Sequence, residues 1–188
     1  LALLLIGFSL FSAVVLALSH FRPANYVSQP GARAMGLLLL AALTGLQITH
    51  FAWLHLDLPW IDSMAYRILL FSVAPAFFMF SEPLLTPAAD QPKPLLMCCH
   101  LAPALIAPWL PAAIALPLAF VIGALYLLWL TRRIYQLRAE RSQYHQEIIL
   151  LGLVFLIAVV VAALGLFKHV LAEKYFFSLY ATAIGLAF

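Results

Sequence analysis

Long apolar runs separated by short polar segments make up almost the whole chain, and most of them are long enough for a helix to cross a bilayer. About 30 Å of hydrocarbon requires roughly 20 helical residues. On this criterion the sequence predicts seven transmembrane helices, over residues 1–19, 35–56, 66–84, 94–109, 112–131, 147–167 and 174–188. No alternating pattern of a membrane barrel is present. We therefore expect an all-α, polytopic membrane helix bundle that forms one domain over residues 1–188.

One uncharged stretch is too long for a single span. It runs from Leu95 to Thr131. Pro108 and Pro111 lie near its middle, and a proline inside a helix removes a backbone donor and clashes with the preceding turn. The sequence thus predicts two helices in an antiparallel hairpin that turns near Trp109.

Composition supports the membrane assignment. Of the 188 residues, 66% are hydrophobic and 9% are charged, and the mean hydropathy is +1.07, whereas soluble domains carry roughly 25% charged residues. A net charge of +3 would suit nucleic-acid binding, but the basic residues flank apolar runs and are better interpreted as topology signals. The two cysteines, Cys98 and Cys99, are adjacent inside an apolar run and predict no disulfide framework.

The segment TRRIYQLRAERSQYHQE, residues 131–147, holds four arginines between two predicted spans. Basic residues favour cytoplasmic loops, so we expect the N-terminus outside, the C-terminus in the cytoplasm, and the chain in the cytoplasmic membrane of a bacterium. This orientation places inside the basic residues Arg22, Arg33, Lys93, Arg132, Arg133, Arg138 and Arg141. Three interpretations of the arginine loop remain open: a topology determinant, a contact with anionic lipid, or a coupling element that meets a soluble domain.

Polar residues inside spans are costly in hydrocarbon and are the first candidates for function. Thr44, Gln47 and His50 follow one another at three-residue steps and so share one face of the second predicted helix. Near the predicted outer end lie aromatic and basic residues: Trp53, His55, Trp60, Tyr66, Arg67, Lys168, His169 and Lys174. They form either an outward-opening pocket for an anionic or amphipathic signal, or hydrogen bonds between helices beneath an ordinary aromatic belt.

A second candidate pair is Glu82 and His100, which the predicted spans place at similar depth near the cytoplasmic side. They form either an ion pair that responds to protons or a structural cap. Cys98, Cys99 and His100 are consecutive, so a helix points them about 100° apart and they cannot converge on one metal ion. We expect no metal site, no cofactor and, since no catalytic pattern is present, no enzyme activity.

Three segments carry a resemblance to a known family. YRILLFSVAPAFFMFSEPLL has a proline followed by aromatic residues near the end of helix three, CCHLAPALIAP has a His-Leu-x-Pro start to helix four, and RRIYQLRAERSQYHQEIILLGLVFL has a basic, aromatic connection from helix five to six. In these features the chain resembles the membrane-embedded N-terminal region of AraC-type transcription regulators, in which about seven helices precede a cytoplasmic helix-turn-helix domain.

Two functions follow as hypotheses. The resemblance implies a sensory input domain that receives a small-molecule or membrane signal and passes it to a DNA-binding domain after residue 188, since the sequence begins without methionine and stops inside an apolar run. The alternative is a small-solute transporter or a structural subunit of a membrane complex, although no acidic residue lies deep in any span to carry a coupled ion. The expected partners are membrane lipids, the signal, DNA through the further domain, and a second copy in a homodimer.

Overall fold

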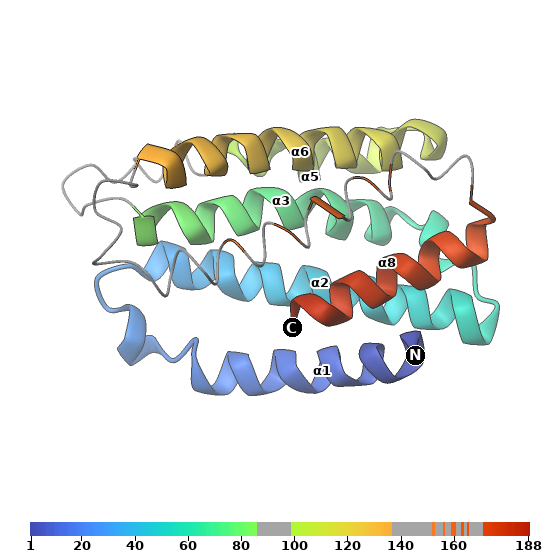
Figure 1. Ribbon diagram of the computed structural model, residues 1–188, viewed down its shortest axis with the longest axis horizontal. Coiled ribbons are helices and arrows are strands. Elements are labelled where there is room, and N and C mark those ends of the chain that lie inside the picture. Colours follow the sequence, from blue (N-terminus) through green and yellow to red (C-terminus); the bar gives the residue numbers. More distant parts are fainter. Residues whose placement is uncertain are drawn as a thin grey trace.

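Helices make up the regular structure of the part of the chain that the computed structural model describes, which is residues 1–85, 99–136, 152, 156, 159–160, 163, 165 and 171–188 (Figure 1). The α-helices are α1 (Ala2–Ser19), α2 (Pro30–Leu56), α3 (Met64–Leu85), α5 (Ala102–Ile106), α6 (Ala112–Gln136) and α8 (Glu173–Ala187). The 3-10 helices are η1 (Pro23–Tyr26), η2 (Trp60–Asp62) and η4 (Ala107–Trp109).

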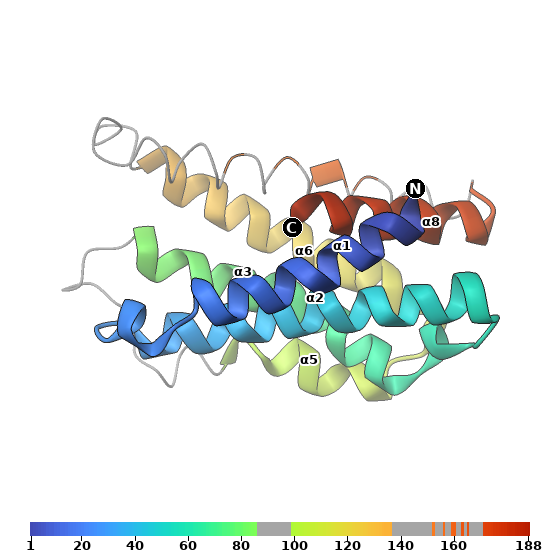
Figure 2. The ribbon, with the colours of Figure 1, turned by 90° about the horizontal axis from the view of Figure 1, so that it is seen from below.

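Helix α2 is the central element of the bundle. It packs against α1, α3 and α8, while α3 also packs against α5 and α6. Helices α1, α3, α6 and α8 run in one direction and α2 runs in the other (Figures 1 and 2). One end of the bundle, which we call the η2 end, therefore gathers the end of α2, all of η2 and η4, and the starts of α3, α6 and α8. The opposite end, the η1 end, holds η1 and the C-terminal turns of α3 and α6.

Four helices are long and apolar enough to cross a membrane: Ala2–Ser19, Pro30–Leu56, Met64–Pro83 and Ile114–Arg133. They correspond to the predicted spans 1–19, 35–56, 66–84 and 112–131. The segment predicted as a span over 147–167 lies largely outside the described residues, and α8 matches the predicted start of the last span to within one residue. All-helical architecture is confirmed for the described chain; the number of spans and the sides of the termini stay predictions.

The exposed surface of α1 supports a membrane location. Only 22% of its span window is buried inside the protein. Its large apolar side chains instead point outward, which water would disfavour and lipid tails accommodate. The large apolar residues of α1 that are at least 44% exposed are Leu3, Leu4, Phe8, Phe11, Val14, Val15 and Leu18.

Local sequence signals explain the helix boundaries. Pro30 occupies the first turn of α2, where its missing N–H costs nothing, and Asp57 ends the helix in a left-handed conformation with φ of 53°. The Ser63 hydroxyl oxygen accepts a bond from the Tyr66 N–H at 3.1 Å, an N-cap that starts α3. The α5–η4 segment ends at Trp109, and Leu110 is extended between η4 and α6, as a residue that precedes a proline, here Pro111, favours. The predicted break is therefore present, and no continuous helix joins the α5–η4 segment to α6.

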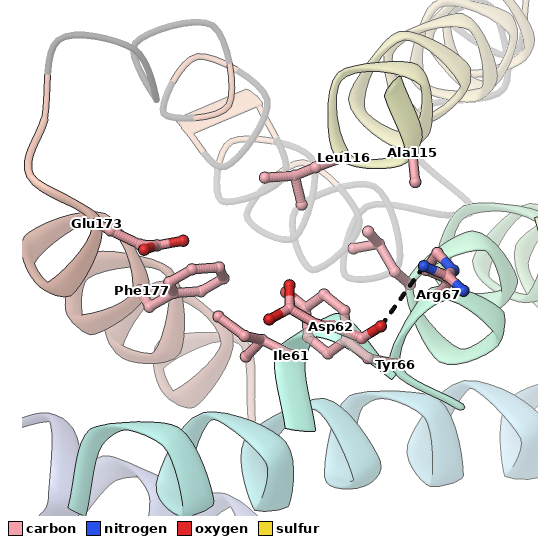
Figure 3. Close-up of a pocket in the computed structure, with 9 residues that line it drawn as sticks. Ile61, Asp62, Tyr66, Arg67, Ala115, Leu116, Glu173 and Phe177 are labelled. Carbon is pink, nitrogen blue, oxygen red and sulfur yellow. Dashed lines mark hydrogen bonds between the residues drawn. The ribbon is translucent and has the colours of Figure 1, made fainter. Parts of the chain in front are cut away.

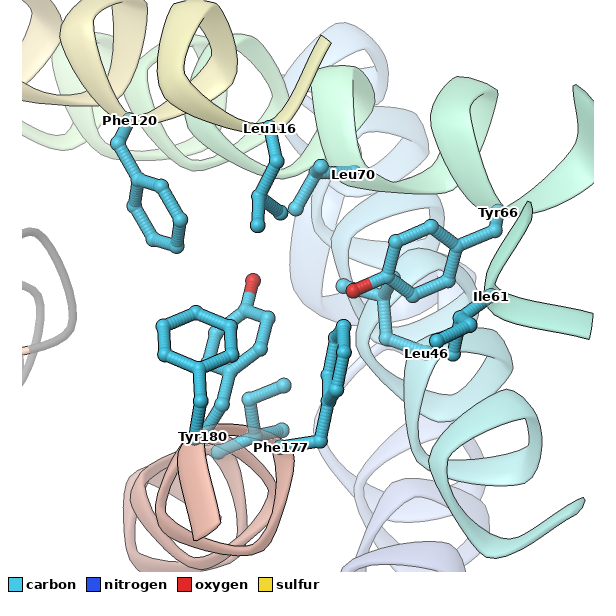
Figure 4. Close-up of a cluster of buried hydrophobic side chains, with 10 residues drawn as sticks. Leu46, Ile61, Tyr66, Leu70, Leu116, Phe120, Phe177 and Tyr180 are labelled. Atoms are coloured by element: carbon cyan, nitrogen blue, oxygen red, sulfur yellow. The ribbon is translucent and has the colours of Figure 1, made fainter. Parts of the chain in front are cut away.

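The largest buried cluster lies at the junction of α2, α3, α6 and α8 (Figure 4). Its buried members are Leu46, Ile61, Tyr66, Leu70, Leu116, Phe120, Phe176, Phe177, Tyr180 and Ile184. Glycine lets two helix pairs approach closely. A Cβ on Gly45 of α2 would lie 2.6 Å from Leu69 of α3, and one on Gly185 of α8 would lie 2.6 Å from Leu5 of α1.

Candidate functional site

The predicted polar stripe of α2 faces the bundle interior. Gln47 and His50 are fully buried at 0% exposure. The Gln47 side-chain nitrogen donates to the backbone oxygen of Ala181 in α8 at 3.0 Å, and Nε2 of His50 lies 3.3 Å from the Tyr66 hydroxyl of α3. The stripe thus links α2 to α3 and to α8, since each buried polar group must find a partner.

Part of the stripe's hydrogen-bonding capacity is left over. Among the described residues, Thr44 Oγ1, Gln47 Oε1 and His50 Nδ1 are buried atoms without a partner. An unsatisfied polar atom costs about 1–3 kcal/mol when buried. Three such atoms on successive turns of one helix therefore lower the stability of the bundle at this place. Local features that reduce stability are common at functional sites.

A cleft opens next to this stripe at the η2 end (Figure 3). It has a volume of about 40 Å³. We call it the η2-end cleft, and its lining residues come from η2, α3, α6 and α8: Ile61, Asp62, Tyr66, Arg67, Leu70, Ala115, Leu116, Glu173 and Phe177. An adjoining cavity of about 330 Å³ is lined by Trp53, Asp57, Glu173 and Lys174. Glu173, in the first turn of α8, lines both spaces.

Tyr66 connects the η2-end cleft to the polar stripe. Its ring lines the cleft, while its hydroxyl contacts His50. The imidazole of His50 also lies against the rings of Phe177 and Tyr180, with centroids 5.6 and 5.1 Å apart. In Figure 4 the hydroxyls of Tyr66 and Tyr180 both point toward the middle of the cluster. The wall behind the cleft is therefore aromatic with polar atoms set into it, a composition typical of small-molecule sites.

The charged residues of the cleft differ from the sequence-based expectation. Arg67 donates to the backbone oxygens of Asp62 and Pro108 at 3.5 and 3.4 Å, so its guanidinium holds the η2 and η4 turns together. Asp62 and Glu173 contribute carboxylates, and no ion pair neutralises either of them among the described residues. Of the predicted cations, Arg67 lines the cleft and Lys174 the adjoining space, and sequence reasoning did not include these two carboxylates among the site residues.

Of the other residues predicted at this end, some line one of the two spaces and others do not. Trp53 packs on Phe177 with ring centroids 5.0 Å apart and lines the adjoining cavity, as Lys174 also does. His55 is exposed and lies against Phe51, and Trp60 is 47% exposed; neither lines the two spaces. Predicted members Lys168 and His169 lie outside the described residues.

At the η1 end, Glu82 and His100 have separate partners. Glu82, 7% exposed, accepts from Nη2 of Arg133 in α6 at 3.3 Å. His100 Nδ1 lies 2.9 Å from the Tyr126 hydroxyl. No hydrogen bond or ion pair joins Glu82 directly to His100 in the described chain.

Of the four arginines of the predicted cytoplasmic patch, only Arg132 and Arg133 lie within the described residues. Arg132 is exposed, whereas Arg133 forms the ion pair with Glu82. Arg138 and Arg141 are not described. Arg133 therefore has a structural role that the three interpretations of the loop did not include.

Two residues of α8 were missed by sequence reasoning, Phe177 and Tyr180. A signal was available, because five of the seven buried positions of α8 recur at helical spacing and predict an inward face: 176, 177, 180, 181 and 184. Within the described residues, no group of three or more metal-ligating side chains converges.

Comparisons with known proteins found no match: no protein-family profile, curated protein or solved structure resembles the chain significantly.

Proposed function

We propose that this chain is the membrane-embedded sensory domain of a one-component transcription regulator of the bacterial inner membrane. In this proposal the η2-end cleft receives a signal molecule, and the last helix passes the change to a cytoplasmic helix-turn-helix domain after residue 188. The observation that carries the proposal is the set of polar contacts from α2 to α3 and α8 directly behind the cleft.

These contacts supply a means of coupling. A ligand shifts a conformational equilibrium only by binding one state more tightly than the other. The Gln47–Ala181 bond ties α2 to the backbone of α8, while the carboxylate of Glu173 in the first turn of α8 lines the cleft. A molecule that contacts Glu173 and the wall around Tyr66 would therefore act on α8 through its first turn and through the ring of Phe177.

Two features of the chain favour a sensor over a transporter. First, the resemblance to the AraC-type membrane region implies a DNA-binding domain after the final helix. Second, the polar groups of the stripe join helices to one another, and the buried acidic residue Glu82 is paired with Arg133. These arrangements suit a bundle with two packings better than a polar path across the membrane.

The first test is the sequence that follows Phe188. A cytoplasmic helix-turn-helix domain is expected there, and a stop codon within a few residues would overturn the proposal.

A second test uses the full-length regulator and a reporter driven by its own promoter. The double variant Gln47→Leu/His50→Leu should insert normally but hold reporter output at one level across growth conditions. Thr182→Val is the matched control, because the Thr182 hydroxyl bonds only within its own helix, to Ser178 O at 2.8 Å. Wild-type regulation by an inserted double variant would show that the stripe serves only to hold helices together.

A further inference from the structure

We propose that the connection between α1 and α2 binds the phosphate groups of anionic phospholipids at the membrane surface. The connection runs over residues 20–29, contains η1 and lies at the η1 end of the bundle (Figure 1). Sequence reasoning used the arginines around it only to predict topology. This lipid contact lies away from the η2-end cleft and does not depend on the proposed sensor function.

Two arginines are fixed at the end of α1 by their Nε atoms. Nε of Arg22 donates to the backbone oxygen of Leu18 at 2.8 Å, and Nε of Arg33 donates to that of Phe21 at 2.7 Å. The two acceptor carbonyls are three residues apart, so both guanidinium groups lie at the same end of the helix. In the described chain, no hydrogen bond or ion pair engages the Nη atoms of either side chain. The free N–H groups of a guanidinium match the geometry of phosphate oxygens.

Positive charge is in excess at this end of the bundle. The described charged side chains at the η1 end are Arg22, Arg33, Arg132, Arg133 and Glu82, and those at the η2 end are Asp57, Asp62, Arg67, Glu173 and Lys174. Glu82 is paired with Arg133. An anion at the η1 end therefore meets arginines without an ion-pair partner and, among the described residues, no unpaired carboxylate. Such a surface is complementary to anionic headgroups.

An exposed apolar side chain beside the arginines favours a lipid over a free phosphate. Val27, which directly follows η1, is 82% exposed. The preceding residue, Tyr26, is buried, stacks on Phe21 with ring centroids 5.6 Å apart and has its hydroxyl 2.8 Å from Nε2 of His20. The packed turn thus presents Val27 outward. At a membrane surface this side chain can enter the acyl boundary while the arginines reach the headgroups.

The test measures lipid binding to the full-length protein in a neutral detergent by native mass spectrometry. The probes are phosphatidylglycerol and phosphatidylcholine with the same acyl chains, so they differ in the headgroup and its charge. We expect phosphatidylglycerol to bind more tightly by about tenfold or more, because each basic residue near an anionic headgroup contributes about fivefold. Excess glycerol phosphate, which carries the phosphate without acyl chains, should not displace the lipid.

Arg22→Gln and Arg33→Gln should each weaken binding of phosphatidylglycerol by about fivefold and leave binding of phosphatidylcholine unchanged. Arg22→Lys and Arg33→Lys should keep most of the preference, because lysine retains the charge but lacks the guanidinium that bonds to the α1 carbonyl. Lys174→Gln is the matched control, since this exposed basic residue lies at the opposite end of the bundle, and it should bind both lipids as the wild type does.

Equal binding of the two lipids, displacement by glycerol phosphate, or unchanged binding of phosphatidylglycerol by both glutamine variants would each overturn the inference. An equal loss in Lys174→Gln would do so as well. Loss of the preference in the lysine variants as well as in the glutamine variants would show that the arginines act only by holding the end of α1, and would also overturn it.

Discussion

Replacing Arg133 by glutamine should destabilise the bundle, because it leaves the carboxylate of Glu82 buried without its partner. Glu82 is 7% exposed and its Oε1 lies 3.3 Å from Nη2 of Arg133. Removing one member of a buried ion pair is costly because the remaining charge keeps its desolvation penalty. Arg132, the neighbouring exposed residue, provides a matched control with the same change of charge.

The magnitude follows from the geometry of the pair. At the 3.3 Å separation, Coulomb's law with an effective dielectric constant of about 20 gives an attraction of about 5 kcal/mol. The arginine side chain is 43% exposed and the glutamate side chain 9%, so water screens one partner well and the other poorly. An exposed pair contributes about 0.2–1 kcal/mol, and breaking a buried pair costs about 3–5 kcal/mol. Because this pair lies between the two cases, we expect Arg133→Gln to lower the free energy of unfolding by about 2 kcal/mol.

The assay is a double-mutant cycle on the purified protein. Unfolding by sodium dodecyl sulfate is followed by circular dichroism for the wild type, Arg133→Gln, Glu82→Gln and the double variant. The double variant should cost less than the sum of the single variants by at least about 1 kcal/mol, since both charges are then gone. Arg132→Gln should change the free energy of unfolding by less than about 0.5 kcal/mol. Additive single costs, or an equal cost for Arg132→Gln, would refute the pairing argument.

Three further predictions concern packing, topology and the turns of the η2 end. Gly185→Ala should destabilise the protein by about 1–3 kcal/mol, because a Cβ there would press on the side chain and backbone of Leu5, while Gly7→Ala, with open space around it, should be neutral or slightly stabilising in the same unfolding assay. A cysteine that replaces Ser142 should react with a membrane-impermeant maleimide only after the inner membrane is opened. Labelling from the periplasmic side would show that the orientation is the reverse of the predicted one. Arg67→Met should cost about 1–3 kcal/mol by removing two hydrogen bonds to carbonyls of neighbouring turns, and an unchanged unfolding midpoint would show that these bonds contribute nothing.

The sequence predicts the helices well where one strong local signal decides the outcome. Apolar runs next to charged residues mark α1, α2 and α3, and the prolines Pro108 and Pro111 mark the break before α6. The inward direction of Gln47 and His50 also follows from their spacing on one helix. These features depend on a few neighbouring residues, so no knowledge of the tertiary arrangement is needed.

Pairings between distant helices were not predictable in the same way. Glu82 and Arg133 are 51 residues apart, and depth in the membrane alone made His100 an equally good partner for Glu82. The choice depends on which faces of α3, α5 and α6 meet, and no pattern within one helix contains that information. The acidic character of the η2-end cleft was missed for the same reason, because Asp62 and Glu173 come together only when α8 packs beside η2.

The packing of α8 against α1 has a consequence for how the protein is made. Gly185 of α8 lies against Leu5 of α1, so α1, which leaves the ribosome before the other described helices, has as a neighbour the described helix that leaves it last. Until α8 is synthesised, the side of α1 that α8 will cover faces lipid, the translocon or an insertion chaperone. The contact between α1 and α8 must then form late, after the helices that lie between them in the sequence have been made. A truncation that removes α8 should consequently leave α1 inserted but easily extracted, and a prime substrate for membrane proteases.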